Sequence, residues 1–258
     1  MKSDPPNSPA LTNLHIGTAG WTLPKDLAHH FPAPGDAKLT HLQRYADRLH
    51  CVEINSSFHR PHLRKTWERW AATTPPNFRF SVKLPKSITH TAKLQNTGAL
   101  LETFLDQATG LGEKLGPLLI QLPPSLAFDE PLAHDILTTL RELYPAPNPA
   151  ALEPRHPSWF TPAADRLLRS FDTARVAADP PKGSPAAATP GGSQALRYYR
   201  LHGSPRTYYS PYTTVDLTRI AQTLRAPSTA TDTWVIFDNT ALGHATANAL
   251  HLSRLLNL

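Results

Sequence analysis

Short apolar segments of strand length recur along the chain and alternate with segments whose apolar residues are spaced three or four apart. The strand-like segments lie at 14–18, 51–55, 78–84, 116–122, 150–153, 174–178, 196–201 and 233–238. The helix-like segments lie at 39–49, 63–72, 100–111, 132–143, 163–171, 217–224 and 245–256. Helical spacing favours an amphipathic helix, and a short apolar run between turn residues favours a buried strand. The pattern therefore predicts alternating strands and helices.

Two segments depart from this alternation. The stretch "PPKGSPAAATPGGSQ" at 180–194 is too rich in Pro, Gly and Ala to form a packed helix, and we interpret it as a mobile loop. The first thirteen residues, "MKSDPPNSPALTN", have no periodic pattern and are predicted to be a disordered N-terminal segment. Residues 14–258 remain as one domain.

Regular alternation of strand and helix is typical of a parallel sheet of the α/β class. Eight such repeats within 258 residues favour a single-domain (βα)8 TIM-type barrel, a fold of about 250 residues. An open, doubly wound sheet is the structural alternative.

The composition limits which cellular compartment and which binding partners we expect. No apolar run is long enough to span a membrane, and the N-terminus lacks the apolar core of a signal peptide, so we expect a cytoplasmic protein with no membrane partner. The single cysteine, Cys51, excludes an internal disulfide and any Cys-based zinc cage, and we expect it to face the helices. The net charge of +6 favours anionic partners. Because the basic residues are scattered, nucleic acid is only weakly supported as one of them.

Polar side chains follow the end of nearly every predicted strand. In TIM barrels the carboxyl ends of the strands converge on one face, where polar residues are more often functional. We therefore expect these side chains to line a shared mouth. They are Trp21, Glu53, Asn55, Lys83, Gln121, Glu153, Arg155, Arg200, His202, Asp238 and Asn239.

The segments that carry these residues resemble a known family. "GTAGW", "VEINSSF", "FRFSVK", "ITH", "LGPLLIQLPPS", "EPRHPSW", "YYRLHG" and "FDNT" occur in the order and at the spacing of the domain of unknown function 72 family, also called YecE-like proteins. The resemblance extends from Ile16 to about Leu255. It implies a TIM-type barrel, and it implies no reaction, because the activity of the family is unassigned.

The charges at the predicted mouth favour an anionic ligand over a metal. Glu53, Glu153 and Asp238 balance Lys83, Arg155 and Arg200, and three nearby cations would repel a divalent metal ion. We therefore predict that the mouth binds a small polar ligand, best an anionic, phosphate-bearing one. In an enzyme, Glu53 or Glu153 would exchange protons with the help of His202 while Lys83, Arg155 and Arg200 hold the anion. We therefore expect no metal. We also expect no cofactor, and the chain has neither a P-loop nor a G-x-G-x-x-G motif, the usual signatures of nucleotide-driven chemistry.

Several alternatives remain open at this point. The same charges could form a structural ion-pair network that plugs the barrel. A metal-dependent hydrolase or nuclease could use the strand-end Glu, Asp and His residues, and a glycosidase could use Glu53 with Glu153. A sensor or binding module would keep the pocket without catalysis.

One more site is predicted in the loops after the seventh and eighth strands. In many barrels these loops bind phosphate through free backbone N–H groups. Asn239 and Thr240 could donate hydrogen bonds, and Gly203 and Gly243 would let the backbone approach an anion closely. The helix that begins near Ala245 would point its positive end at that anion.

Overall fold

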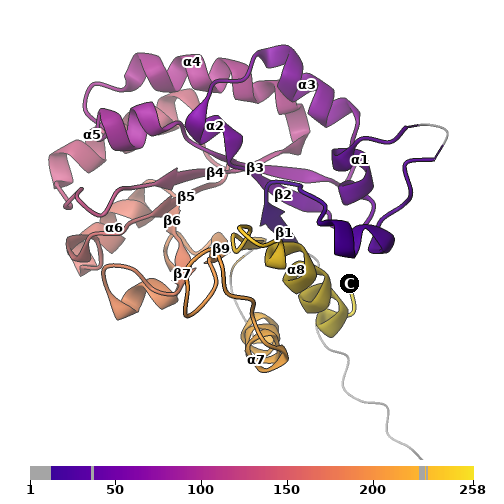
Figure 1. Ribbon diagram of the computed structural model, residues 1–258. Helices are drawn as coiled ribbons and strands as arrows, with labels where there is room; N and C mark the ends of the chain where they lie inside the picture. The colour runs from indigo at the N-terminus through magenta and orange to yellow at the C-terminus, as the bar shows by residue number, and fades with distance from the viewer. Residues whose placement is uncertain (1–12, 36–37, 227–229, 231) are drawn as a thin grey trace, which may run out of the picture.

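The protein is described by a computed structural model that covers residues 13–35, 38–226, 230 and 232–258. Its strands are β1 (Leu14–Ala19), β2 (Cys51–Ile54), β3 (Arg79–Lys83), β4 (Leu115–Gln121), β5 (Ala150–Glu153), β6 (Thr173–Arg175), β7 (Ala177–Asp179), β8 (Gly191–Gly192), β9 (Leu196–Leu201) and β10 (Asp232–Phe237). Its α-helices are α1 (His41–Ala46), α2 (Ser56–His59), α3 (Arg64–Ala72), α4 (Gly98–Ala108), α5 (Glu130–Leu143), α6 (Pro162–Ser170), α7 (Thr214–Arg225) and α8 (His244–Leu256). Figure 1 shows the helices arranged around the sheet.

The sheet forms a barrel of parallel strands. Its order runs β7-β9-β10-β1-β2-β3-β4-β5-β6, with β8 added antiparallel to β6. Only Val176 separates β6 from β7, and its N–H donates to the carbonyl of Leu152 at 2.9 Å. The two segments are therefore one interrupted strand, which pairs with β5 on one side and β9 on the other. This confirms the predicted α/β TIM-type barrel and excludes the open sheet.

Two apolar clusters follow from the alternation of side chains along each strand. The larger cluster packs the helices against the outside of the sheet. The smaller one fills the barrel interior with Cys51, Leu119, Ala151, Ala174, Val176, Leu196, Tyr198, Trp234 and Ile236. The expectation that Cys51 faces the helices was wrong, because Cys51 and Glu53 are two residues apart and so share one face of β2. Burial inside the barrel raises the pKa of the Cys51 thiol.

Side-chain caps start several helices where the sequence pattern predicted them. Thr213 and Asp216 form a capping box at the start of α7. Asp129 accepts a hydrogen bond from the N–H of Leu132 at 3.0 Å, directly before α5. These caps satisfy N–H groups that have no partner within the helix.

The segment 180–194 holds no α-helix. It contains a short 3-10 helix, Pro185–Ala188, and the strand β8. Its mobility stays a prediction. The predicted N-terminal segment lies outside the described residues, except for Asn13. No helix in the described part of the chain has both the length and the apolar character needed to cross a membrane.

Candidate functional site

A single guanidinium organises the carboxyl end of the barrel. Arg200 on β9 is completely buried, and it donates to Glu53 through Nε at 3.0 Å and through Nη2 at 2.7 Å. Its Nη1 donates to Glu153 Oε2 at 2.7 Å, and Nη2 also donates to Asp238 Oδ2 at 2.9 Å. Three strands, β2, β5 and β10, thus bring their terminal carboxylates to one cation.

The mutual charges of this network keep it ionised despite its burial. Burial raises the pKa of the Glu153 carboxyl, but the charges of Arg200, His202 and Arg155 outweigh that effect and hold the pKa well below its usual value. For Asp238, burial is outweighed in the same way by Arg200 and His202, and its pKa is lowered. Burial without such partners would force carboxylates toward the neutral form.

His202 lies beside Arg200 and contacts the same carboxylates. Its Nδ1 lies 3.1 Å from Asp238 Oδ2, and its Nε2 lies 3.3 Å from Glu153 Oε1. Both ring nitrogens can donate only when the imidazole is protonated. Burial lowers the pKa of His202, but the charge of Glu153 and the two hydrogen bonds raise it above its usual value. The geometry therefore favours an imidazolium.

The floor beneath this network includes a residue that the sequence analysis did not single out as a site residue. Tyr198 donates to Glu53 Oε2 at 2.8 Å, and its hydroxyl lies 2.7 Å from that of Ser81. Tyr198 precedes Arg200 by two residues on β9, so it faces the barrel interior one layer lower. That spacing is the signal that could have identified it.

Lys83 lies at the end of β3, and its surroundings differ from those of Arg200. The residue is 9% exposed, and its ammonium lies 4.2 Å from the centroid of the Phe58 ring. Among the described residues, its Nζ makes no ion pair and no hydrogen bond. Burial and the charge of Arg200 lower the pKa of Lys83 to about 8, although Glu53, Glu153 and Asp238 act in the opposite direction.

Two further predicted residues, Arg155 and Gln121, lie next to these charged side chains. Arg155 donates through Nη2 to Glu153 Oε1 at 3.0 Å, and 18% of its side chain is exposed. Gln121 pairs in register with Glu153 on the neighbouring strand and is 6% exposed. Within the described part of the chain, the Gln121 amide has no hydrogen-bond partner. The ring of Tyr208 stands edge-on to that of His202, with centroids 5.7 Å apart.

The structure thus brings together most of the predicted mouth. Glu53, Lys83, Glu153, Arg155, Arg200, His202 and Asp238 form one charged cluster at the carboxyl end of the barrel. Their functional roles remain proposals. The remaining predicted residues lie in other settings. Trp21 packs edge-on against Trp70 at 5.1 Å, and one oxygen of Asn55 is buried without a hydrogen-bond partner among the described residues.

The loops after β9 and β10 use most of the groups that were predicted to bind an anion. The Asn239 amide donates to Ser210 and Asn248, and the N–H of Ala245 donates to the Asn239 carbonyl. A side chain at Gly243 would meet Pro24 at 2.8 Å, so this glycine serves the packing of α8. Thr240 is exposed. These contacts already occupy most of the polar groups of the two loops, and anion binding there stays a prediction.

The carboxylates of the cluster are poorly arranged for a metal. Glu53 gives both oxygens to Arg200, and Glu153 gives its oxygens to Arg200 and Arg155. Across the described ranges, no group of three or more His, Cys, Asp and Glu residues is placed to hold a metal ion. The metal-dependent alternative therefore gains no support from this geometry.

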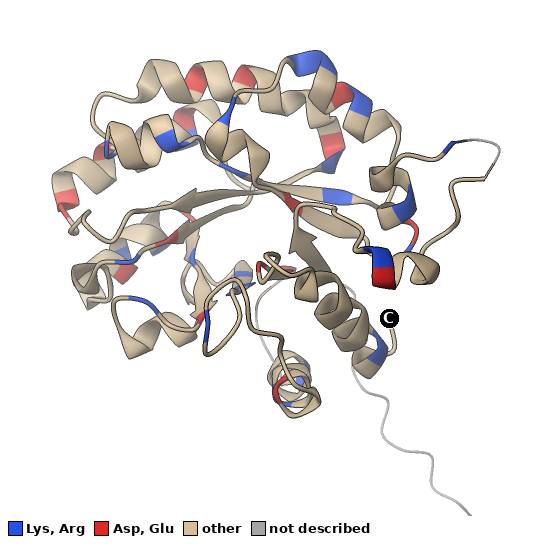
Figure 2. Cartoon of the chain, in the orientation of Figure 1, with Lys and Arg blue, Asp and Glu red and all other residues tan. Residues whose placement is uncertain are grey.

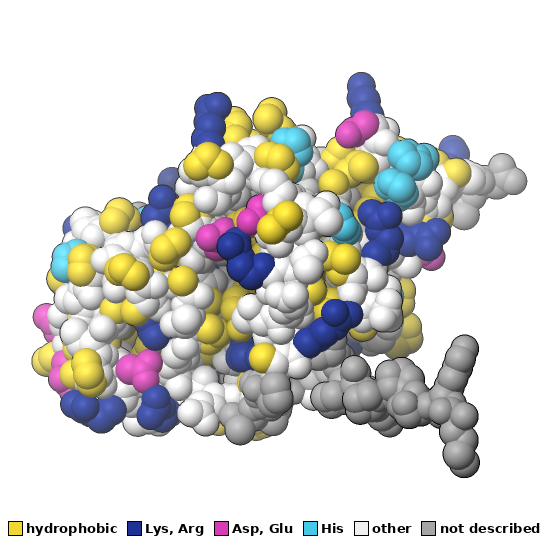
Figure 3. Space-filling model, turned by 90° about the horizontal axis from the view of Figure 1, so that it is seen from below, with side chains coloured by type: hydrophobic (Ala, Val, Ile, Leu, Met, Phe, Trp, Pro, Cys, Tyr) yellow, Lys and Arg dark blue, Asp and Glu magenta, His cyan; other side chains and the backbone are white. Residues whose placement is uncertain are grey.

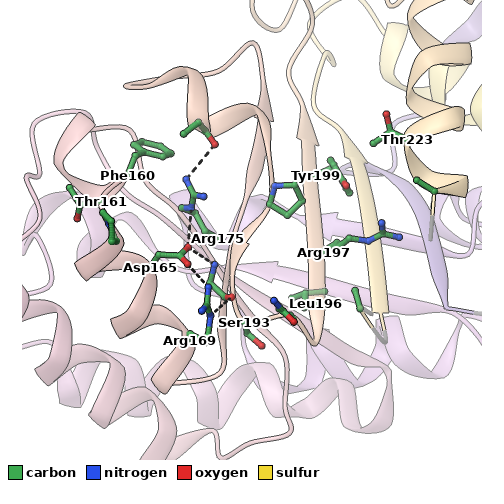
Figure 4. A pocket seen from close by; sticks show the side chains of 18 residues that line it. Phe160, Thr161, Asp165, Arg169, Arg175, Ser193, Leu196, Arg197, Tyr199 and Thr223 are labelled. Atoms are coloured by element: carbon green, nitrogen blue, oxygen red, sulfur yellow. Dashed lines mark hydrogen bonds and ion pairs between the residues drawn. The ribbon is translucent and has the colours of Figure 1, made fainter. Parts of the chain in front are cut away.

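A separate cavity of about 770 Å³ lies on the outside of the barrel, between α6, β8 and β9. Figure 4 shows Arg175 and Arg169 on either side of Asp165 in this cavity. Arg169 donates to Asp165 at 2.6 Å, and Arg175 Nε lies 3.8 Å from the same carboxylate. Both arginines also donate to backbone carbonyls of the segment 180–194. We interpret this group as an anchor for that segment, distinct from the barrel mouth.

Charged side chains on the outer surface are dispersed. Figure 2 shows both signs distributed over the outer helices, and on the face in Figure 3 the Lys and Arg side chains lie in small separate groups. No continuous basic surface is visible in that view. The expectation of a nucleic-acid partner therefore gains nothing from these views and stays weakly supported.

Comparison with known proteins places this barrel in a family. The family model described as "Protein of unknown function DUF72" matches residues 15–258. The chain belongs to the DUF72 family. Over 148 residues it is 29% identical to the UPF0759 protein YecE of Escherichia coli K12, a match that covers 57% of this chain and 50% of YecE. With the UPF0759 protein YunF of Bacillus subtilis it shares 27% identity over 164 residues, which cover 61% of this chain and 56% of YunF. The chain thus spans about half the length of the curated relatives it matches.

Solved structures of DUF72 proteins share the fold. The protein EF0366 of Enterococcus faecalis V583 superposes with a TM-score of 0.77 at 21% identity, over 95% of this chain and 96% of that protein. The protein TM1631 of Thermotoga maritima MSB8 gives a TM-score of 0.73 at 25% identity, over 95% and 100% of the two chains. These likenesses support the barrel and name no ligand or reaction.

Proposed function

We propose that the carboxyl mouth of the barrel binds a small organic anion and that His202 exchanges protons with it. The proposal depends on the contrast between two sets of polar side chains at the mouth. In the first set, Arg200 and its carboxylates satisfy one another. In the second set, the Lys83 ammonium and the Gln121 amide lack protein partners among the described residues.

Among the described residues, neither Lys83 Nζ nor the Gln121 amide belongs to the fully buried side-chain atoms that lack a partner, so both groups are accessible to solvent although their residues are largely buried. Polar groups that are accessible and have no protein partner can orient a ligand that enters the mouth. An anion beside Lys83 and Arg155 would supply a charge to both cations, and the Gln121 amide would donate a further hydrogen bond.

Arg200 has a different role in this proposal from the one expected from the sequence. Because its Nε, Nη1 and Nη2 all donate to carboxylates, the guanidinium holds the site rather than the ligand. It fixes Glu153 and Asp238, and these two carboxylates fix the His202 ring between them. Such preorganisation allows a charged group to act without rearrangement.

We assign His202 as the proton donor of the cluster, through the Nε2–H that lies 3.3 Å from Glu153 Oε1, the longer of its two contacts. The imidazolium is held by Glu153 and Asp238, whose lowered pKa values keep them as carboxylates near neutral pH. A general acid works best when its pKa is near the working pH, which the raised pKa of His202 favours. The same lowered pKa makes Glu153 a poor acid and disfavours a glycosidase that would use it as one.

Thermal unfolding in the presence of small anions tests the binding. We expect phosphate, a sugar phosphate or a small carboxylate to raise the Tm of the wild-type protein at millimolar concentration, since a ligand stabilises the state that binds it. Arg155→Met should reduce that shift. Arg219→Met should leave the Tm shift unchanged, because Arg219 pairs with Asp216 on the surface of α7 and is not part of the charged cluster. Equal shifts in all three proteins, or none, would contradict the proposal.

Turnover separates an enzyme from a binding module. A ligand that raises the Tm and is converted to a product, with the conversion lost in His202→Gln, identifies catalysis. A ligand that raises the Tm and is recovered unchanged identifies the binding alternative.

A further inference from the structure

Lys83 combines three features that the binding of an anion does not by itself require. The residue is almost fully buried, its ammonium lies on an aromatic ring, and no carboxylate pairs with it although three are close in the cluster. Within the described residues these carboxylates bind Arg200, His202 and Arg155 instead. A lysine kept for its charge alone would normally be paired.

We propose that Lys83 is a nucleophile that forms an imine with the carbonyl group of a small oxo acid or oxo phosphate. This inference rests on the proposed function, because the anionic group of the same ligand would bind Arg155 and Gln121. It adds the substrate class, a carbonyl compound, and a covalent step.

The reaction balances within the mouth. The neutral Nζ of Lys83 attacks the carbonyl carbon, and one proton moves from this nitrogen to the former carbonyl oxygen, which gives a neutral carbinolamine. The C–O bond then breaks, the hydroxyl leaves as water with a proton from His202, and the nitrogen lone pair forms the C=N bond. The resulting iminium keeps the positive charge that the ammonium had, so Glu53, Glu153 and Asp238 stabilise both states.

The surroundings supply what such a lysine needs. Desolvation in an apolar setting and a neighbouring cation are the two ways in which proteins activate an amine. Phe58 provides the apolar contact. The hydroxyl of Ser57 donates a hydrogen bond to the backbone carbonyl of Lys83 at 2.6 Å, which fixes the end of the strand. Arg200 provides the neighbouring cation.

The protonation state agrees with this chemistry. With a pKa of about 8, the free-amine fraction at pH 7 is about 300-fold larger than for a lysine at 10.5. The charged groups around Lys83 come from several elements and include both signs. They are Arg200 on β9, Glu53 on β2, Glu153 on β5, Asp238 after β10, and His90 of the turn after β3.

Reductive trapping tests the proposal on the wild-type protein. Pyruvate and sodium cyanoborohydride at pH 7 would convert the imine into a stable secondary amine, and peptide mapping by mass spectrometry would locate it. We expect Lys83 to be modified at least about 10-fold faster than the exposed Lys65 on α3, because the lowered pKa of Lys83 leaves a larger fraction of its amine neutral. The rate at Lys83 should level off above pH 8.

Two variants serve as controls. Lys83→Met should lose the fast adduct, and Lys65→Met should keep it. Absence of an adduct at Lys83, or modification that follows the exposure of the lysines, would overturn the inference.

The same experiment separates this inference from the proposed function. If pyruvate raises the Tm without any adduct at Lys83, the anion site stands and the imine does not. If acetone, a ketone that lacks the carboxylate of pyruvate, is trapped at Lys83 as fast as pyruvate, the imine stands and the anion site does not.

Discussion

Replacement of Arg200 by methionine is the strongest perturbation of the charged cluster. Methionine keeps most of the apolar stem but removes the four donor contacts to Glu53, Glu153 and Asp238. The three carboxylates would then remain buried without their central cation. Removal of one partner from a buried ion pair typically costs about 3–5 kcal/mol, because an uncompensated charge is left behind. That is a large share of the roughly 5–15 kcal/mol that stabilises most domains.

The cost should depend on pH. In the wild type the pKa values of Glu153 and Asp238 are lowered by Arg200, so their stabilising contribution is present above about pH 4 and is lost as the pH falls through the folded-state values. Without Arg200, burial dominates and raises these pKa values above those of the unfolded chain. Protonation then relieves the penalty, and the difference between variant and wild type should be smaller at pH 5 than at pH 7.

Urea unfolding at both pH values measures this. Arg219→Met is the control, since exposed pairs such as Arg219 with Asp216 contribute about 0–1 kcal/mol. The double variant Arg200→Met with Glu53→Gln should recover part of the loss, because it also removes one unpaired carboxylate. A cost of less than about 1 kcal/mol for Arg200→Met at pH 7, or the same cost at both pH values, would refute the reasoning.

Three other results are expected. In an NMR titration, His202 should stay protonated above pH 6.5. His62 should titrate below pH 6.5, because burial and Arg60 lower its pKa. The reverse order would contradict the assigned imidazolium. Tyr198→Phe should lower the free energy of unfolding by about 1.5–3 kcal/mol, since it removes a hydrogen bond to the Glu53 carboxylate, and an unchanged urea midpoint would exclude that bond. Cys51 should react with a thiol reagent only after the protein unfolds, because it is fully buried and burial raises its pKa; rapid labelling of the native protein would place it elsewhere.

Much of the barrel could be predicted because each strand has a recognisable apolar pattern in its own short segment. The segment 150–153 coincides with β5, and the apolar spacing at 132–143 and 217–224 located α5 and α7. The interruption at Val176 could not be predicted in the same way. It arises from pairing with two different neighbours, β5 and β9, which no local pattern encodes.

The site shows the same division. The polar residue at each strand end predicted which charges would meet, because parallel strands in a barrel share one carboxyl face. The pairing within the cluster depends on side-chain reach across the barrel, so the sequence could not distinguish Arg200, which binds three carboxylates, from Lys83, which binds none of them. The error for Cys51 was of another kind. The alternation rule itself places residues 51 and 53 on one face, and the rule was applied wrongly.

The central claim is that Lys83, which pairs with no carboxylate among the described residues, and Arg155, which pairs with Glu153 but stays partly exposed, bind the anionic ligand. A crystal structure of the protein soaked with pyruvate, or with the small anion that raises the Tm most, tests it most directly. We expect density for the anion in the mouth, within hydrogen-bond distance of Arg155 and Gln121 and beside Lys83. An anion bound instead between Arg169 and Arg175 outside the barrel, with only water in the mouth, would contradict it.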